Sequence, residues 1–310
     1  MSGSVWDDLA PRQQTVEAAL RAALEGAAAS APPALREAMG YSLFAPGKRL
    51  RPLLCVLACE AVGGPSAAAL PAACAVEMVH TYSLIHDDLP AMDDDDLRRG
   101  LPTCHKKFGE ALAILAGDAL LTLAFEVLAT GCPPRTAAVS CAELAAGAGA
   151  VGMVGGQVLD LEVEGRIPAA GDGAVNRRDA DRLVATHRAK TGALFRSALR
   201  LGAYAAQAER PGGVDPEALA AVEAYAAAFG LAFQVTDDLL DVESSADRTG
   251  KRVGKDAARG KLTYPGLLGV DASRRKAKEL GQDAVAAAER LGPGGTPLAR
   301  LARFVVERDR

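Results

Sequence analysis

Two clusters of aspartates are the residues of this sequence best suited, by type and by spacing, to form a reactive or metal-binding site. In the first, Asp87 and Asp88 end an apolar run of helical character, and four more aspartates follow at 93–96. Ionised carboxylates on a core-facing helix are costly unless a cation pairs with them. The nearest basic residues lie beyond Pro90, which should end or kink the helix. Mg²⁺, which takes carboxylate oxygens and keeps positions open for substrate phosphates, is therefore the natural partner.

The second cluster is Asp237, Asp238 and Asp241, in an equally apolar stretch. Asp237 and Asp241 are four positions apart and share one face of a helix. Like charges so placed destabilise even an exposed helix by roughly 0.2–0.5 kcal/mol, and the flanking Phe, Leu and Val residues indicate burial. The run 93–96 alone would more simply be a solvated acidic turn. Two apolar helices that each carry paired carboxylates instead favour facing walls of one metal site.

Basic residues gather in three segments, at 47–51, 98–107 and 248–261. Lys48, Arg49 and Arg51 stand just ahead of an apolar helix, where free backbone N–H groups help to bind an anion, although an exposed basic turn is the commoner explanation. The 310 residues carry a formal net charge of −4, so this positive charge is local. Beside the aspartates, it suits a diphosphate bound through Mg²⁺.

For some other polar residues, a functional role is indicated only by their relation to these clusters. His80 is seven residues before Asp87 and shares its helix face. A lone helical histidine is usually a satisfied core or surface residue, but one on the face of a carboxylate site is better explained as a ligand contact. Lys190 and Thr191 would, without context, be an ordinary surface pair.

Composition excludes several classes of protein. A net charge of −4 gives no electrostatic footprint for nucleic acid or an anionic membrane. The amino terminus has acids where a signal peptide has basic residues. Charges interrupt the Ala-rich stretches, so no segment is expected to reach the roughly 18 apolar residues of a membrane span. The six cysteines form no Cys-x-x-Cys pair and are interpreted as core thiols. A cytoplasmic protein is expected.

Apolar positions recur every three to four residues, with no alternating strand pattern, internal repeat or long linker. Helices are predicted at 12–28, 34–39, 53–62, 67–88, 108–130 and 179–205, and another follows the cap and proline of Asp215-Pro216. Gly152, Gly155 and Gly156 lie inside a further predicted helix, which indicates close helix approach or a nearby ligand, with a local break as the alternative. The fold is predicted to be all-α, in one domain over 1–310.

Three motifs together resemble those of the trans-isoprenyl diphosphate synthases. They are Gly47-Lys-Arg-Leu-Arg-Pro52, Asp87-Asp-Leu-Pro-Ala-Met-Asp93 with Arg98-Arg99, and Asp237-Asp-Leu-Leu-Asp241. The resemblance covers nearly the whole chain and is greatest to the bacterial farnesyl diphosphate synthases. It implies an isoprenoid synthase-type helical bundle around a central cavity, a homodimer, and head-to-tail condensation of isopentenyl diphosphate onto an allylic diphosphate.

The resemblance also implies a role for each matching position. Three Mg²⁺ ions are expected, two held by Asp87, Asp88 and Asp93, and the third by Asp237, Asp238 and Asp241. The allylic diphosphate would be gripped by Arg98, Lys190 and Lys251, and isopentenyl diphosphate by Lys48, Arg51, His80 and Arg99. The developing allylic cation would be faced by Thr191 and Gln234, with Lys261 at the mouth of the cavity.

These roles agree with the chemistry of the reaction. Ionisation of an allylic diphosphate leaves a delocalised cation and a highly charged leaving group, which divalent ions and basic side chains stabilise. An apolar cavity keeps water from the cation. No side chain is an obvious base for the final proton loss, so the released diphosphate is hypothesised to accept it.

Tyr82 and Ser83 are predicted to limit product length. Tyr82 lies five positions before Asp87, about 7 Å along a helix axis. The resemblance implies that an aromatic residue at this position stops the product at C15, whereas small residues allow C20 or more. On an ideal helix Ser83, not Tyr82, shares the face of Asp87, so Tyr82 as ordinary core is the alternative. A C15 product is predicted.

Other functions remain as alternatives. A synthase of C20 or longer products is the main one, and a non-catalytic regulatory subunit is more distant, because such a subunit could lose metal ligands that this chain keeps. A terpene cyclase would carry a second metal motif of the Asn/Asp-x-x-Ser/Thr-x-x-x-Glu kind, which differs from the motif here. A structural or Ca²⁺-buffering protein would not explain the three basic segments.

Overall fold

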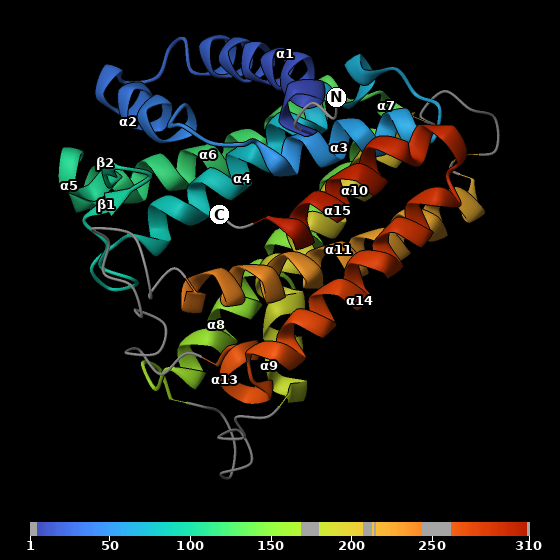
Figure 1. Ribbon diagram of the computed structural model, residues 1–310. Helices are drawn as coiled ribbons and strands as arrows, with labels where there is room; N and C mark the ends of the chain where they lie inside the picture. The colour runs from blue at the N-terminus through green and yellow to red at the C-terminus, as the bar shows by residue number, and fades with distance from the viewer. Residues whose placement is uncertain (1–4, 169–179, 207–212, 214, 244–261, 309–310) are drawn as a thin grey trace. The chain divides into compact units, whose positions relative to one another are not determined.

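The computed structural model describes residues 5–168, 180–206, 213, 215–243 and 262–308 (Figure 1). They are almost entirely helical, which confirms the predicted fold class. The one sheet among them is an antiparallel pair, β1 (Leu97–Arg98) with β2 (Leu101–Pro102). The sequence analysis missed it because two-residue strands leave no alternating pattern.

Contacts divide the chain into two compact units. The first consists of residues 1–144 and 201–214, and the second of residues 145–200 and 215–310. The single domain over 1–310 stays a prediction.

The first unit is built around α4 (Leu70–Asp87). It packs against α1 (Val5–Ala27), α2 (Pro33–Leu43), α3 (Leu50–Ala61), η1 (Ser66–Ala69) and α6 (Glu110–Gly131) (Figure 1). Eleven of its 18 residues are buried, so this helix is apolar on nearly every side, as a core helix must be. The polar residues that α4 carries therefore lie in or beside the core.

Two predicted boundaries in this unit are wrong for local reasons. Helix α1 begins at Val5 and contains Pro11, where the prediction began after the proline. The stretch predicted as one helix at 108–130 is α5 (Cys104–Phe108) followed by α6, because Gly109 adopts φ +85°, a conformation open to glycine at little steric cost. The last helix that begins in this unit is α7 (Pro134–Ala148).

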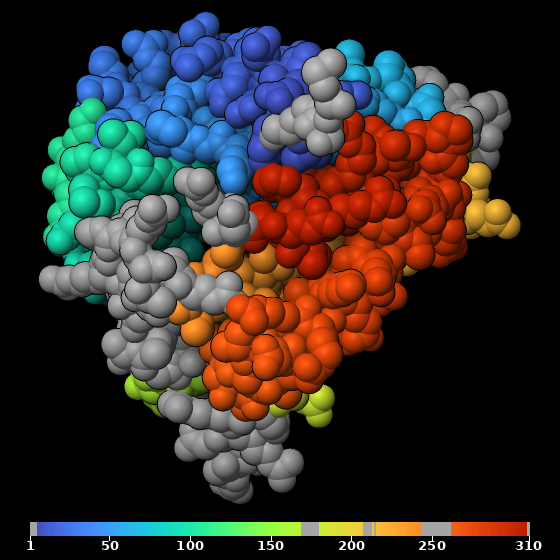
Figure 2. Space-filling view, viewed as in Figure 1, coloured from blue at the N-terminus to red at the C-terminus, as the bar shows by residue number. Residues whose placement is uncertain are grey.

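The second unit is built around α11 (Pro216–Glu243), which packs along α14 (Val270–Glu289). The Asp215 carboxylate accepts the backbone N–H of Glu217 at 2.9 Å, which confirms the predicted cap. The neighbours of α11 include η3 (Arg188–Gly192), α13 (Tyr264–Leu268) and α15 (Thr296–Glu307). Helices α14 and α15 pack side by side and form a continuous surface in the space-filling view (Figure 2). The other elements are α8 (Met153–Val163), α9 (Ala180–His187), α10 (Ala193–Ala206) and η5 (Gly292–Gly295).

The predicted glycine-containing helix shows both a local break and a close approach of backbones, at different glycines. The helix is broken between α7 and α8, where Gly152 has ψ −130°. Gly156 lies inside α8 at a close approach, since an added Cβ would lie 2.1 Å from the backbone nitrogen of Lys190. The predicted helix at 179–205 is likewise three pieces, α9, a π-helical turn at η3, and α10.

Two expectations from composition have different outcomes. All six cysteines are free, and Cys55, Cys59, Cys74 and Cys104 are buried, so core thiols are confirmed at these four positions. The expectation that no segment could span a membrane is wrong by length and composition. Four helical stretches qualify, Ser66–Asp87, Glu110–Gly131, Pro134–Val163 and Pro216–Val242, with between 39% and 67% of each apolar window buried in the protein.

Candidate functional site

The first aspartate cluster folds back onto the end of its own helix. Asp87 is the last residue of α4 and Asp88 is its cap. The chain then reverses, because the Asp93 N–H donates to the Asp87 carbonyl at 2.7 Å and the Asp95 N–H donates to the Asp88 carbonyl at 3.3 Å. The predicted solvated turn is therefore anchored, and Asp93 returns close to the backbone of Asp87.

Asp88 is paired with an arginine from the hairpin that follows this turn. Arg98 donates from Nε to both carboxylate oxygens at 2.7 and 2.9 Å, and its Nη2 lies 2.6 Å from Oδ1. Only 4% of the Asp88 side chain is exposed, and this burial raises its pKa despite the opposing effect of Arg98. The sequence argument passed over this pair because Pro90 ends the helix, but the turn and hairpin carry Arg98 back.

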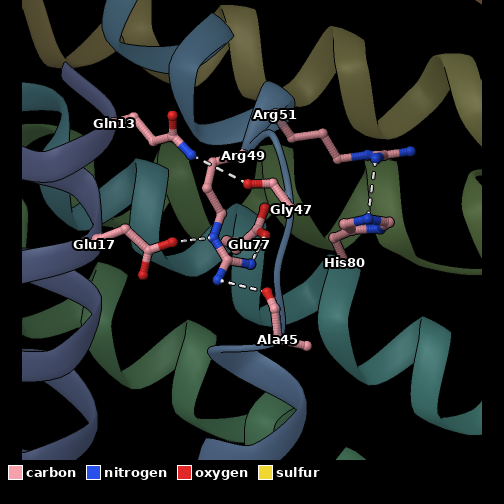
Figure 3. Close-up of polar contacts among 8 residues, drawn as sticks. All are labelled: Gln13, Glu17, Ala45, Gly47, Arg49, Arg51, Glu77 and His80. Carbon is pink, nitrogen blue, oxygen red and sulfur yellow. Dashed lines mark hydrogen bonds and ion pairs between the residues drawn. The ribbon is translucent and has the colours of Figure 1, made fainter. Parts of the chain in front are cut away.

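A second basic group joins Arg51 of α3 to His80, which lies on α4 about two turns before Asp87. Arg51 Nη1 lies 3.2 Å from His80 Nε2 (Figure 3). Burial lowers the pKa of His80 well below 6.5, and Arg51, Arg99, Arg98 and Arg49 lower it further. Neutral His80 therefore accepts the Arg51 hydrogen bond, because a guanidinium can only donate. Arg51, Arg98 and Arg99 are thus all close enough to His80 to lower its pKa, and their role in anion binding stays a prediction.

Lys48 and Arg99, the other basic residues predicted to bind isopentenyl diphosphate, also have identifiable neighbours. Lys48 Nζ lies 5.4 Å from the centre of the Trp6 ring, a cation–π distance. Gly47 lies directly beside Arg99, since a Cβ at Gly47 would be 2.5 Å from Arg99 Nη1. The 47–51 turn therefore lies against Arg99 of the hairpin.

The state of His80 makes stability depend on pH. The folded protein keeps His80 neutral, whereas the unfolded chain protonates it near pH 6.5. Its contribution is therefore complete above that pH and is lost as the pH falls toward the depressed folded pKa. We expect His80→Gln to reduce the fall in thermal stability between pH 7.5 and 5.5, by about 1 kcal/mol at pH 5.5. Thermal melts across this range measure it, and parallel declines for the two proteins would contradict it.

The residues predicted to limit product length lie on α4 before this site. Tyr82 is 7% exposed and its ring meets that of His86 edge to face, with centroids 5.6 Å apart. His86 is fixed in turn, because its Nε2 lies 3.1 Å from the Ile114 carbonyl oxygen and the ring fills the space beside Gly117. The Ser83 hydroxyl donates to the His80 carbonyl at 2.9 Å. Tyr82 is thus a bulky residue held in place by α6.

The second cluster joins three predicted residues, Thr191, Gln234 and Asp238, in one network. The Thr191 hydroxyl donates to Gln234 Oε1 at 2.9 Å, and Gln234 Nε2 donates to Asp238 Oδ1 at 3.2 Å. The other oxygen of Asp238 accepts the backbone N–H of Tyr264 at 2.9 Å. Asp237 lies 3.3 Å from Arg308 Nη2. Asp238 is therefore buried and held by protein donors, whereas 58% of the Asp237 side chain is exposed.

Lys190 lies in the π-helical turn η3 and pairs with Asp160 of α8. Its Nζ is 2.5 Å from Asp160 Oδ2. Such turns are rare and often occur at functional sites, and Gly156 gives the backbone of Lys190 room to approach α8. Because η3 packs against both α8 and α11, Lys190 reaches Asp160 of α8 and Thr191 reaches Gln234 of α11.

The carboxylates fit Mg²⁺ by their chemistry. No group of three or more acidic, histidine or cysteine side chains forms a ready cage among the described residues. Mg²⁺ seldom needs one, because it is usually held by one or two carboxylates together with water and substrate phosphates. Asp87, Asp93, Asp237 and Asp241 are all at least partly exposed, so they could serve in this way. That the two clusters face each other stays a prediction.

Some functional candidates were missed and some lie outside the described residues. Lys251 and Lys261 belong to the latter. The sequence analysis missed Asp160 and Arg308, which contact Lys190 and Asp237. It counted Arg49 among the basic side chains of the anion site, which is wrong, because Arg49 is buried against Glu17 and Glu77. Asp160 follows the glycine motif directly and could have been found there, but Arg308 carries no signal near either cluster.

The chain matches the polyprenyl synthetase family model over residues 32–290. Farnesyl diphosphate synthase of Escherichia coli is 48% identical over 283 residues, which are 88% of this chain and 89% of that protein. Chloroplastic geranylgeranyl pyrophosphate synthase of Catharanthus roseus is 46% identical over 279 residues, 89% of this chain and 74% of the relative. The crystal structure of an FPP/GFPP synthase from Zymomonas mobilis has a TM-score of 0.77 at 36% identity, and covers 95% of this chain and 98% of its own.

Proposed function

The chain belongs to the polyprenyl synthetase family, and on that premise we propose that this trans-prenyl diphosphate synthase makes (E,E)-farnesyl diphosphate. It would condense isopentenyl diphosphate with dimethylallyl diphosphate and then with geranyl diphosphate. The observation that carries the proposal is the first unit's gathering of Arg51, His80 and Arg98 beside the aspartates that end α4. Cations next to acidic metal ligands suit a substrate that carries a diphosphate.

Mg²⁺ is proposed as the cofactor, with Asp87, Asp93, Asp237 and Asp241 as the ligands best supported by exposure. When bound, the metal neutralises charge on the leaving diphosphate. Asp88 would act mainly by holding Arg98 through its bidentate contact, so that the guanidinium is in place before the substrate arrives.

The polar groups of the second unit suit the developing cation. Gln234 accepts a hydrogen bond from the Thr191 hydroxyl and donates one from its amide to Asp238. The side chains of Thr191 and Gln234 are therefore both fixed. Neutral oxygens held in this way stabilise an allylic cation without forming a bond to it, because their dipoles need not reorganise. Lys190, held by Asp160, would bind the diphosphate that leaves.

Product length is the finer part of the proposal. A C15 product is supported by Tyr82, a buried ring fixed by His86. A C20 product is the second candidate, because the Catharanthus roseus geranylgeranyl pyrophosphate synthase is about as similar to the chain as the Escherichia coli farnesyl diphosphate synthase.

The product and its limit can be tested together. Wild-type protein with Mg²⁺, isopentenyl and dimethylallyl diphosphates should yield mainly a C15 alcohol after dephosphorylation. We expect Tyr82→Ala to shift the main product to C20 or longer, because truncation removes the ring that ends the tail's path, whereas Tyr82→Phe keeps the ring and should still give C15. Chromatographic sizing distinguishes them. A C15 product from Tyr82→Ala would rule out Tyr82 as the limit, and C20 from wild type would favour the second candidate.

We also propose that the protein is a cytoplasmic homodimer that does not insert into membranes. Ile114 and Leu115 of α6 are 41% and 55% exposed, and such apolar side chains on a long helix suit contact with a second copy. Two of the four membrane-length stretches bury more than half of their apolar window within the protein, which favours their role as core helices.

A further inference from the structure

Arg49 lies inside the basic turn, but its side chain contacts acidic and carbonyl groups of the protein. It occupies the cap position before α3 with φ +51°, a left-handed conformation that residues other than glycine adopt only when their surroundings enforce it. Only 2% of its side chain is exposed. Arg49 is therefore built into the first unit and is not placed to meet a substrate.

Its guanidinium joins three separate segments (Figure 3). Nε donates to Glu17 of α1 at 2.5 Å, Nη1 donates to Glu77 of α4 at 2.8 Å, and Nη2 donates to the Ala45 carbonyl at 3.1 Å. Gln13 of α1 adds a further tie, from its Nε2 to the Gly47 carbonyl at 3.1 Å. The 45–49 segment is thus fastened to two helices.

The same fastening sets the position of Arg51. Glu77 and His80 are three residues apart on α4 and so occupy one face. Arg49 contacts the first of them and Arg51 the second. The two arginines therefore form adjacent contacts between the turn and one face of α4, and a shift of Arg49 would move Arg51 relative to His80.

We propose that Arg49 is a positioning residue, whose contacts with Glu17 and Glu77 hold the 47–51 turn so that Lys48 and Arg51 are preorganised to bind isopentenyl diphosphate. This rests on the proposed function for the roles of Lys48 and Arg51. An anion bound by several cations is sensitive to small displacements of any of them. Lysine could not replace Arg49, because one ammonium does not span acceptors on three segments in a fixed fork.

The test is a pair of variants that act on the turn without touching the substrate. Glu17→Gln removes the charge of a partner whose side chain is 28% exposed, and Arg49→Lys replaces the guanidinium with a single ammonium. We expect the KM for isopentenyl diphosphate to rise about 5- to 20-fold in Glu17→Gln and more in Arg49→Lys. The kcat and the KM for geranyl diphosphate should stay within about twofold of wild type. Steady-state kinetics and calorimetric binding of isopentenyl diphosphate both report the change.

Arg12→Gln is the matched control. Arg12 also joins α1 to another helix through a carboxylate, with Nη2 2.8 Å from Glu60 of α3, and we expect its kinetics to match wild type. An unchanged KM for isopentenyl diphosphate in Glu17→Gln and Arg49→Lys would overturn the proposal. The proposal would also be overturned if both variants lost thermal stability and, with it, showed a lower kcat and a similar rise in the KM for both substrates. Failure of the wild type to condense the substrates would instead overturn the proposed function.

Discussion

Asp87→Asn should lower the turnover number by about 10²- to 10³-fold. The substitution keeps the size of the side chain and removes the charge. Asp87 ends α4 at the point where the chain folds back to Asp93, and we propose that its carboxylate holds a divalent ion there. Without this charge, less of the negative charge that develops on the leaving diphosphate is neutralised in the transition state. The loss should appear in kcat and be accompanied by a higher Mg²⁺ concentration for half-maximal rate.

Asp96→Asn is the control for this experiment. Asp96 belongs to the same acidic run and makes the same change in charge, but its side chain is 76% exposed and pairs with Lys106 at 2.8 Å. It should retain turnover within about twofold of wild type. Comparable losses in both variants would point to a general effect of charge in the run, and near-normal turnover in Asp87→Asn would exclude Asp87 as a metal ligand.

Lys190→Gln should lower kcat/KM for the allylic substrate by about 10²-fold or more, because a preorganised charge at the leaving group is lost. The KM for isopentenyl diphosphate should hardly change. The variant also leaves the Asp160 carboxylate, 17% exposed, without the Lys190 ammonium, so its thermal stability should fall. Adding Asp160→Asn should recover stability but not turnover, since it removes the uncompensated charge and restores no cation.

Arg182→Gln tests whether losing a different ion pair with α8 also lowers kcat/KM for the allylic substrate. Arg182 of α9 contacts Glu162 of α8 at 2.5 Å, close in sequence to both partners of the Lys190 pair. Its loss should affect thermal stability and leave the kinetics near wild type. If Lys190→Gln behaved in the same way, the Lys190 pair would have a purely structural role.

The sequence predicts what depends on local pattern. Helical periodicity placed α4 and α11 closely, because each is a long apolar helix, and the aspartates at their ends were visible as charges in apolar surroundings. The cap at Asp215 followed from residue type alone. These features need no knowledge of how distant segments meet.

The contacts that organise the site could not be predicted in this way. Arg98 reaches Asp88 only because a turn and a two-residue hairpin reverse the chain, and neither leaves a periodic signal. Arg49 stands between two predicted substrate-binding residues and looks the same in sequence, yet it is buried against Glu17 and Glu77. The direction of a side chain in a turn depends on backbone angles, here a positive φ, and residue type does not fix them.

The buried cysteines in the core of the first unit have thiols of low reactivity. Burial, with a smaller effect of Glu60, raises the pKa of Cys59 to about 11, and burial with Glu77 raises that of Cys74 to about 12. Because the thiolate is the reactive form, alkylating reagents at neutral pH can modify these side chains only after α3 and α4 separate. The rate of labelling therefore reports the opening of the helices that carry Arg51, His80 and the first aspartates, and needs no engineered cysteine.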